Sequence, residues 1–197
     1  MKQRVASILA ALIVSGGFAG TVQAALISVV PTSTDVTGLG TEVTVAIVID
    51  GLAFGADPSL STYDITLQFD DSVIQYASTA FGDPDHGGSW LDLDASGSVT
   101  QATTPTSDSV NLLEVSFATP FVFPNPFNVQ PETFTLAEVT FTTVGTGTSN
   151  IDFGTVVLGD PLAQELTASL SGGSINVLVP IPPALFLFPS ALLAPVS

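Results

Sequence analysis

The chain has 197 residues, enough for one domain with flanking segments, and it carries 18 acidic residues against two basic ones, Lys2 and Arg4. Because contact with a phosphate backbone requires Lys or Arg, this composition excludes nucleic acid as a partner and disfavours anionic lipid. The chain contains no cysteine, so its fold depends on an apolar core, and a hydrophobic content of 46% argues against disorder.

Residues 1–24 have the three parts of a secretory signal peptide. Lys2 and Arg4 form the charged start, residues 5–14 form the apolar stretch, and Val22-Gln23-Ala24 is a small-residue cleavage sequence. We expect cleavage after Ala24 and export through the secretory pathway. The mature chain would then hold no lysine or arginine, so no conventional salt bridge could form within it.

From residue 25 to residue 179 the dominant hydrophobic period is two, which is typical of half-buried strands. The runs lie at residues 27–30, 43–49, 63–69, 73–81, 98–102, 110–117, 133–142, 148–153, 156–158 and 174–179. Glycine, proline, aspartate and serine fill the gaps, and residues 70–72 are expected to form a turn that closes a hairpin. The pattern predicts an all-β protein, a β-sandwich or jelly roll of about nine strands with its carboxylates outside.

Two segments break the alternation. Residues 120–131 contain four prolines and three phenylalanines, which predicts a long, partly packed loop or a cover over a sheet edge rather than a central strand. Residues 179–197 hold a short apolar run between prolines. A membrane-spanning helix needs about 20 apolar residues, so we do not expect an integral membrane protein.

A loop rich in acidic residues and glycine is the best metal-binding candidate in the sequence. Its possible ligands for Ca²⁺ are the carboxylates of Asp83, Asp85, Asp92 and Asp94, with His86 among them. The spacing does not match an EF-hand, and we favour an ordinary solvated turn. No other cofactor is predicted.

The sequence offers little material for catalysis, because it has one histidine and no cysteine, and its only lysine lies in the signal peptide. We therefore predict that the protein is not an enzyme. Carbohydrate binding needs an exposed aromatic platform. Trp90, beside the acidic loop, is the candidate, whereas Tyr63 and Tyr76 lie in strand patterns and are expected to pack.

Residues 63–74, Tyr-Asp-Ile-Thr-Leu-Gln-Phe-Asp-Asp-Ser-Val-Ile, resemble the third strand and following turn of cohesin domains. Further segments agree in their order, at residues 48–52, 112–116, 134–141, 145–149 and 172–177. The resemblance covers most of residues 26–178. It implies a cohesin-like sandwich over residues 25–178, related in architecture to carbohydrate-binding modules.

The same resemblance implies a binding surface, because one sheet face of cohesins, including the third strand, binds a dockerin partner. By the alternation, Asp64, Thr66 and Gln68 point away from the core and form a polar face. Asp64 matches the acidic position of that strand, while Thr62 replaces the amide residue usual two places earlier. An ordinary solvated sheet face is the equal alternative.

Residues 179–188, Val-Pro-Ile-Pro-Pro-Ala-Leu-Phe-Leu-Phe, resemble the start of a PEP-CTERM sorting segment in its Val-Pro-x-Pro variant. That family implies an extracellular or outer-surface protein of a Gram-negative bacterium with an exopolysaccharide-linked sorting system. Pro189 departs from the pattern, and the sequence stops at Ser197 before the expected basic cluster. We therefore expect either that residues 179–197 are a truncated sorting segment or that sorting is impaired.

Two functions follow from the sequence. The first is a non-catalytic, exported, cohesin-like module that associates with a dockerin-like protein or a matrix component. The alternative is a carbohydrate-binding module that binds extracellular polysaccharide through Trp90.

Overall fold

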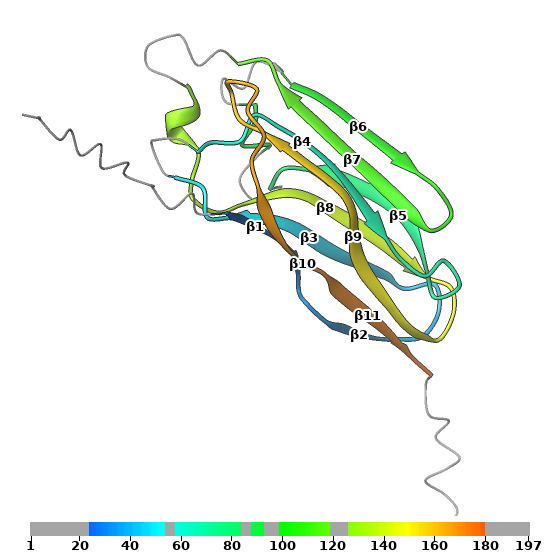
Figure 1. Ribbon diagram of the computed structural model, residues 1–197. Coiled ribbons are helices and arrows are strands. Elements are labelled where there is room, and N and C mark those ends of the chain that lie inside the picture. The colour runs from blue at the N-terminus through cyan, green and yellow to red at the C-terminus, as the bar shows by residue number, and fades with distance from the viewer. Residues whose placement is uncertain (1–23, 54–57, 84–87, 93–98, 119–125, 180–197) are drawn as a thin grey trace, which may run out of the picture.

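The computed structural model of the protein describes residues 24–53, 58–83, 88–92, 99–118 and 126–179, and these form a sandwich of two β-sheets (Figure 1). The first sheet has the strand order β10-β1-β3-β8-β5. Its strands are β1 (Ala25–Val30), β3 (Glu42–Asp50), β5 (Ile74–Phe81), β8 (Phe134–Thr143) and β10 (Ala168–Ser171). The predicted all-β sandwich is confirmed.

The second sheet has the order β2-β11-β9-β4-β7-β6. Its strands are β2 (Thr34–Thr37), β4 (Thr62–Gln68), β6 (Val99–Pro105), β7 (Ser109–Ser116), β9 (Gly147–Gly159) and β11 (Gly173–Leu178). The chain between β10 and β11 crosses from the first sheet to the second. Figure 1 shows that the described chain begins at one end of the sandwich and finishes at the other.

Alternation along the strands places the core. In β3 the buried side chains are Val43, Val45, Ile47 and Ile49, and in β4 they are Tyr63, Ile65 and Leu67. These side chains meet those of β8, such as Phe141, between the two sheets. The Tyr63 hydroxyl spans the sandwich and donates a hydrogen bond of 2.9 Å to the Leu136 carbonyl.

The prediction that all carboxylates lie outside is wrong at Glu114. This side chain is fully buried and follows Val110 and Leu112 on the inner side of β7. Its Oε1 atom accepts a hydrogen bond of 2.8 Å from Gln101 Nε2, and its Oε2 atom has no partner. Residues two apart in a strand lie on the same face of the sheet. Glu114 is therefore buried because it lies on the same face of β7 as Val110 and Leu112.

Three details of the strand prediction are corrected. The four-residue strands β2 and β10, both paired in parallel with a neighbour, were not predicted. The two runs predicted at residues 148–153 and 156–158 form one strand, β9, with an irregular register opposite β4. The turn at Asp70 does not close a hairpin, because it joins β4 of one sheet to β5 of the other.

The segment predicted as a loop or edge cover contains a short 3-10 helix, η1 (Pro126–Val129), in its described part. Phe127 on this helix is buried, and so is Gln130 just after it. The Gln130 side chain clamps the buried backbone of Leu60: its Oε1 accepts from Leu60 N at 2.8 Å, and its Nε2 donates to Leu60 O at 2.6 Å. The segment therefore closes one end of the core.

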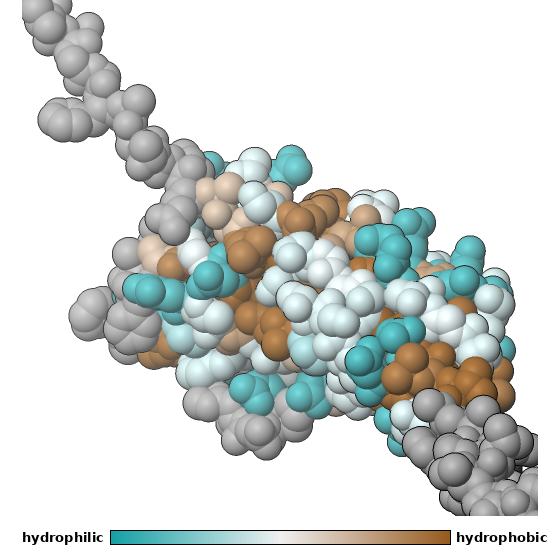
Figure 2. Space-filling model, turned by 90° about the horizontal axis from the view of Figure 1, so that it is seen from below, coloured by the Kyte–Doolittle hydropathy of each residue, from teal (hydrophilic) through white to brown (hydrophobic). Residues whose placement is uncertain are grey.

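The surface carries apolar side chains at the end of the domain from which the C-terminal segment departs (Figure 2). Leu39, Leu178 and Val179 are exposed there, and the Gly38 N–H donates to the Leu178 carbonyl at 3.2 Å. The predicted signal peptide and sorting segment lie almost entirely outside the described residues. Within the described part, no helix is long and apolar enough to cross a membrane.

Candidate functional site

The outer side of the six-stranded sheet holds the three residues predicted to contact a partner. In β4 the residues between the buried ones point outward, and these are Thr62, Asp64, Thr66 and Gln68. The neighbouring strands β7 and β9 flank β4 on either side. We call the outward side chains of these three strands the β4 face.

The centre of the β4 face is a hydrogen-bonded group. The Asn111 Nδ2 atom on β7 donates to Asp64 Oδ1 at 2.5 Å and to Thr66 Oγ1 at 3.2 Å. Asn111 lies opposite Thr66 in the strand register, so the contact follows from the pairing of β4 with β7. This hydrogen bond orients the Asp64 carboxylate, which has further acceptor sites on its two oxygens.

Apolar side chains border this polar centre. In the strand register, Asp64 lies between Val157 of β9 and Leu113 of β7. Val157 is 47% exposed, and Leu113 and Val115 are half-buried. This part of the sheet therefore offers a partner both hydrogen-bond acceptors and an exposed apolar side chain, Val157.

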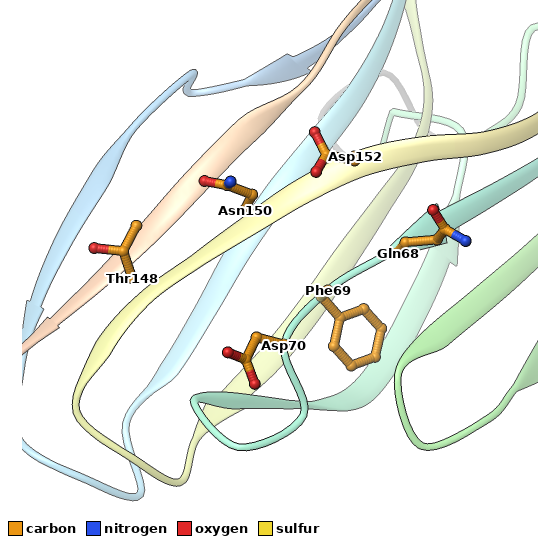
Figure 3. A pocket seen from close by; sticks show the side chains of 6 residues that line it. All are labelled: Gln68, Phe69, Asp70, Thr148, Asn150 and Asp152. Carbon is orange, nitrogen blue, oxygen red and sulfur yellow. The ribbon is translucent and has the colours of Figure 1, made fainter.

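Toward the far end of β4 the surface is hollowed, with a volume of about 300 Å³ (Figure 3). Gln68 and Asp70 line it from β4 and the turn that follows, and β9 contributes Thr148, Asn150 and Asp152. All of these side chains carry oxygen acceptors, and two are carboxylates. The hollow therefore suits a ligand that donates hydrogen bonds or carries positive charge.

Asp70 also has a structural role in this hollow. Its Oδ1 atom accepts hydrogen bonds from Ser72 Oγ at 2.6 Å and from Ser72 N at 2.9 Å. These bonds, the hydroxyl contributing most, lower the pKa of the Asp70 carboxyl below its ordinary value. The Phe69 ring turns inward and packs edge-on against Phe141, with the ring centroids 5.0 Å apart.

The acidic loop proposed as a calcium site falls partly outside the described residues, which omit Asp85, His86 and Asp94. Asp83 pairs with Gly88 across the base of the loop. The Asp92 N–H donates to the Ser89 carbonyl at 3.1 Å. Within the described part of the chain, no three side chains of the metal-binding types gather into a group. The calcium site stays a prediction.

Trp90, the candidate sugar platform, is half-buried and packs against the edge of the core. Its ring lies 6.4 Å from the Phe134 ring, tilted by 51°, and its carbonyl accepts a hydrogen bond from Gln130 Nε2. These contacts give the ring a packing role, and sugar binding by Trp90 stays a prediction. Tyr63 is a core residue, as expected, and Tyr76 packs against the core from the side.

Sequence reasoning missed Asn111 and the β9 residues of the hollow. Asn111 alternates with Val110 and Leu112, so its outward direction was visible in the sequence. Its contact with Asp64 was not visible, because it depends on which strand pairs with β4. The same holds for Asn150 and Asp152, which lie more than 80 residues from β4 in sequence.

No family sequence profile matches the chain, and no curated protein sequence matches it. Solved structures do match, and they show that the fold is that of a cohesin domain. The sixth cohesin of Acetivibrio cellulolyticus scaffoldin B, solved in complex with a mutant Cel5 dockerin, superposes with a TM-score of 0.56 at 16% identity, over 79% of this chain and 100% of that one.

Cohesins from other settings match equally well. The non-cellulosomal cohesin of Archaeoglobus fulgidus gives a TM-score of 0.57 at 8% identity, over 84% of this chain and 99% of that one. The cohesin module of a family 33 glycoside hydrolase from Clostridium perfringens gives 0.57 at 13% identity, over 82% and 100%. The predicted cohesin-like sandwich is confirmed as a fold.

Proposed function

We propose that the protein is a non-catalytic binding module that recognises a protein partner through the β4 face. The observation that carries the proposal is the group formed by Asp64, Thr66 and Asn111, held by hydrogen bonds on a paired central strand and bordered by exposed Val157. A rigid sheet face with oriented acceptors needs little ordering on binding, which favours affinity.

The partner that fits this face brings positive charge. The described residues contain no lysine or arginine, so Asp64, Asp70 and Asp152 have no cation of their own. A dockerin-like protein or a matrix component with basic residues at its contact surface would supply it. The cohesin of Acetivibrio cellulolyticus, solved with a dockerin, supports a partner of the dockerin kind.

We also propose that the protein acts outside the cell, on the surface or in the matrix of a Gram-negative bacterium. The support is the signal-peptide pattern of residues 1–24 and the sorting-like sequence of residues 179–197.

The test is capture of partners from secreted and envelope fractions with the immobilised mature protein, followed by a binding measurement with the purified partner. We expect Asp64→Lys to weaken binding at least tenfold, because it reverses charge at the centre of the face. Glu138→Lys makes the same change on the outer side of β8, in the other sheet, and should leave binding intact. Equal affinity for both variants would refute the proposed face.

A role in polysaccharide binding is the alternative. It predicts that a glycan array binds the wild-type protein and that Trp90→Ala abolishes that signal while Asp64→Lys does not. The packing of the Trp90 ring against Phe134 gives this alternative less support than the protein-binding role.

A further inference from the structure

One side of the sandwich contains a groove between two strand edges that have no neighbour among the described residues. From residue 152 to residue 157, β9 pairs with β4 on one side only, because β11 pairs with β9 no further than Ile151. On the facing side, β10 pairs with β1 alone. Backbone N–H and C=O groups along both edges therefore lack a strand partner among the described residues, which is the condition for strand addition.

This edge groove is a shaped cavity and not only a gap between strands. Its volume is about 310 Å³, and it is lined by Gly154, Val156, Glu165, Leu166, Thr167, Ala168 and Leu170. The side chains of Val156, Leu166 and Ala168 are partly buried and pack against the core. These apolar side chains form the floor of the groove, so the hydrophobic core is accessible from the surface there.

Both ends of the edge groove are closed. At one end Gly159 bridges to Glu165, and the Leu166 N–H donates to the Leu158 carbonyl at 2.9 Å. At the other end Gly173 pairs with Ile151. The open stretch is about six residues long, or roughly 20 Å at about 3.3 Å per residue, which is the length of an ordinary short strand.

The groove combines an apolar edge with a negative charge, and these two features indicate what kind of segment would bind there. Leu170 is 47% exposed at its edge, and an apolar side chain placed there would be removed from water. Glu165 is exposed and has no ion pair, since the described part of the chain holds no lysine or arginine. A second copy of this acidic chain would add negative charge, whereas a basic segment would neutralise it.

We propose that the edge groove binds an extended segment of a partner protein, about six residues long, which alternates apolar residues with lysine or arginine. The segment adds a strand to β9 or β10 through backbone hydrogen bonds. Its apolar side chains reach the floor formed by Val156 and Ala168, and a basic side chain meets Glu165. Strand addition of this kind takes its affinity from the main chain and its specificity from alternate side chains.

The experiment is selection of a phage-displayed library of random nonapeptides against the mature protein, followed by fluorescence anisotropy with the enriched peptides. We expect enriched peptides to alternate apolar and basic residues and to bind at least tenfold more weakly to Glu165→Lys and to Leu170→Lys. Both positions are exposed, so these variants should fold normally, which their melting temperatures would check. Methylation of alternate peptide N–H groups should abolish binding.

A control variant makes the same kind of charge reversal away from the groove. Glu138 lies on β8, three strands from β10 in the same sheet, so Glu138→Lys should bind the selected peptides with wild-type affinity. The proposal is overturned if no peptide is enriched, if the enriched peptides bind Glu165→Lys and Leu170→Lys unchanged, or if N-methylation has no effect.

Discussion

Tyr63 on β4 and Glu114 on β7 lie directly opposite each other in the strand register, and both side chains are completely buried. The pair places a phenol and a carboxyl group in the interior of a domain whose described residues include no lysine or arginine. A buried carboxyl group without a cation is an unfavourable element of a fold, because desolvation is not repaid by an ion pair. Two predictions follow from this geometry.

Replacing Glu114 by glutamine should stabilise the domain. The substitution keeps the side-chain shape and an oxygen acceptor for Gln101 Nε2, and it removes an ionisable group from a fully buried position. We expect a gain of about 1–2 kcal/mol in the free energy of unfolding at pH 8, measured by urea denaturation. Glu114→Ala should instead destabilise the domain through a cavity. A loss of stability in Glu114→Gln would show that the carboxyl group itself is required.

The second prediction concerns alkaline pH. Burial raises the pKa of the Tyr63 phenol well above its ordinary value, and the neighbouring Glu114 carboxyl raises that pKa further. The folded state therefore favours the neutral phenol, whose contribution to stability is complete below the ordinary pKa of about 10 and is lost as pH rises through the folded value. The free energy of unfolding should fall steeply above pH 10.

Tyr63→Phe tests this dependence. The variant should lose about 1 kcal/mol at pH 8, because the hydrogen bond to the Leu136 carbonyl disappears, but its stability should fall less steeply above pH 10 than that of the wild type. Denaturant titrations at pH 8, 10 and 11 provide the measurement. Identical pH slopes for the two proteins would contradict the role assigned to Tyr63.

Gln130, at one end of the core, should contribute strongly to the stability of the domain. Its amide satisfies both backbone groups of Leu60, and it also donates to the Trp90 carbonyl. Gln130→Ala removes the partner of the buried Leu60 N–H and carbonyl, and we expect a loss of about 2–4 kcal/mol in chemical denaturation. Gln130→Glu should also destabilise, because a carboxylate cannot donate to the two carbonyls. Wild-type stability in both variants would show that water replaces the amide at no cost.

The turn after β4 offers a local test by nuclear magnetic resonance. Hydrogen bonds from the Ser72 hydroxyl and then from the Ser72 N–H lower the pKa of the Asp70 carboxyl. A lowered pKa in the folded state means that this contribution to stability is present above the ordinary value of about 3.9 and is lost as pH falls through the folded one. Ser72→Ala should raise the pKa of Asp70 toward its ordinary value. An unchanged titration curve would show that the hydroxyl contributes nothing.

Local patterns predicted the long strands of the fold but not its short edge strands. The alternation of Val43, Val45, Ile47 and Ile49 marks β3 plainly, because every second side chain enters the core. In contrast, β2 and β10 have four residues each and pair in parallel with distant segments. Nothing in so short a polar run separates a strand from a loop, and the edge groove beside β10 was correspondingly invisible.

The sequence predicted which β4 side chains point outward, but it did not predict which residues of other strands lie beside them. Alternation along β4 was sufficient to place Asp64, Thr66 and Gln68 on the surface. Their neighbours Asn111 and Asp152 come from β7 and β9, and only the strand order brings them together. The interior position of Glu114 had a signal in its phase with Leu112, but the general rule that carboxylates stay in water outweighed it.

The proposal that the β4 face binds a protein partner is tested most directly by site-specific photo-cross-linking. A benzophenone amino acid is placed at Thr66, in the centre of the face, or at Thr140, on the outer side of the opposite sheet, and each protein is irradiated with the captured partner. We predict a covalent adduct from position 66 and none from position 140. Adducts from position 140 alone would place the partner on the other sheet and contradict the proposal.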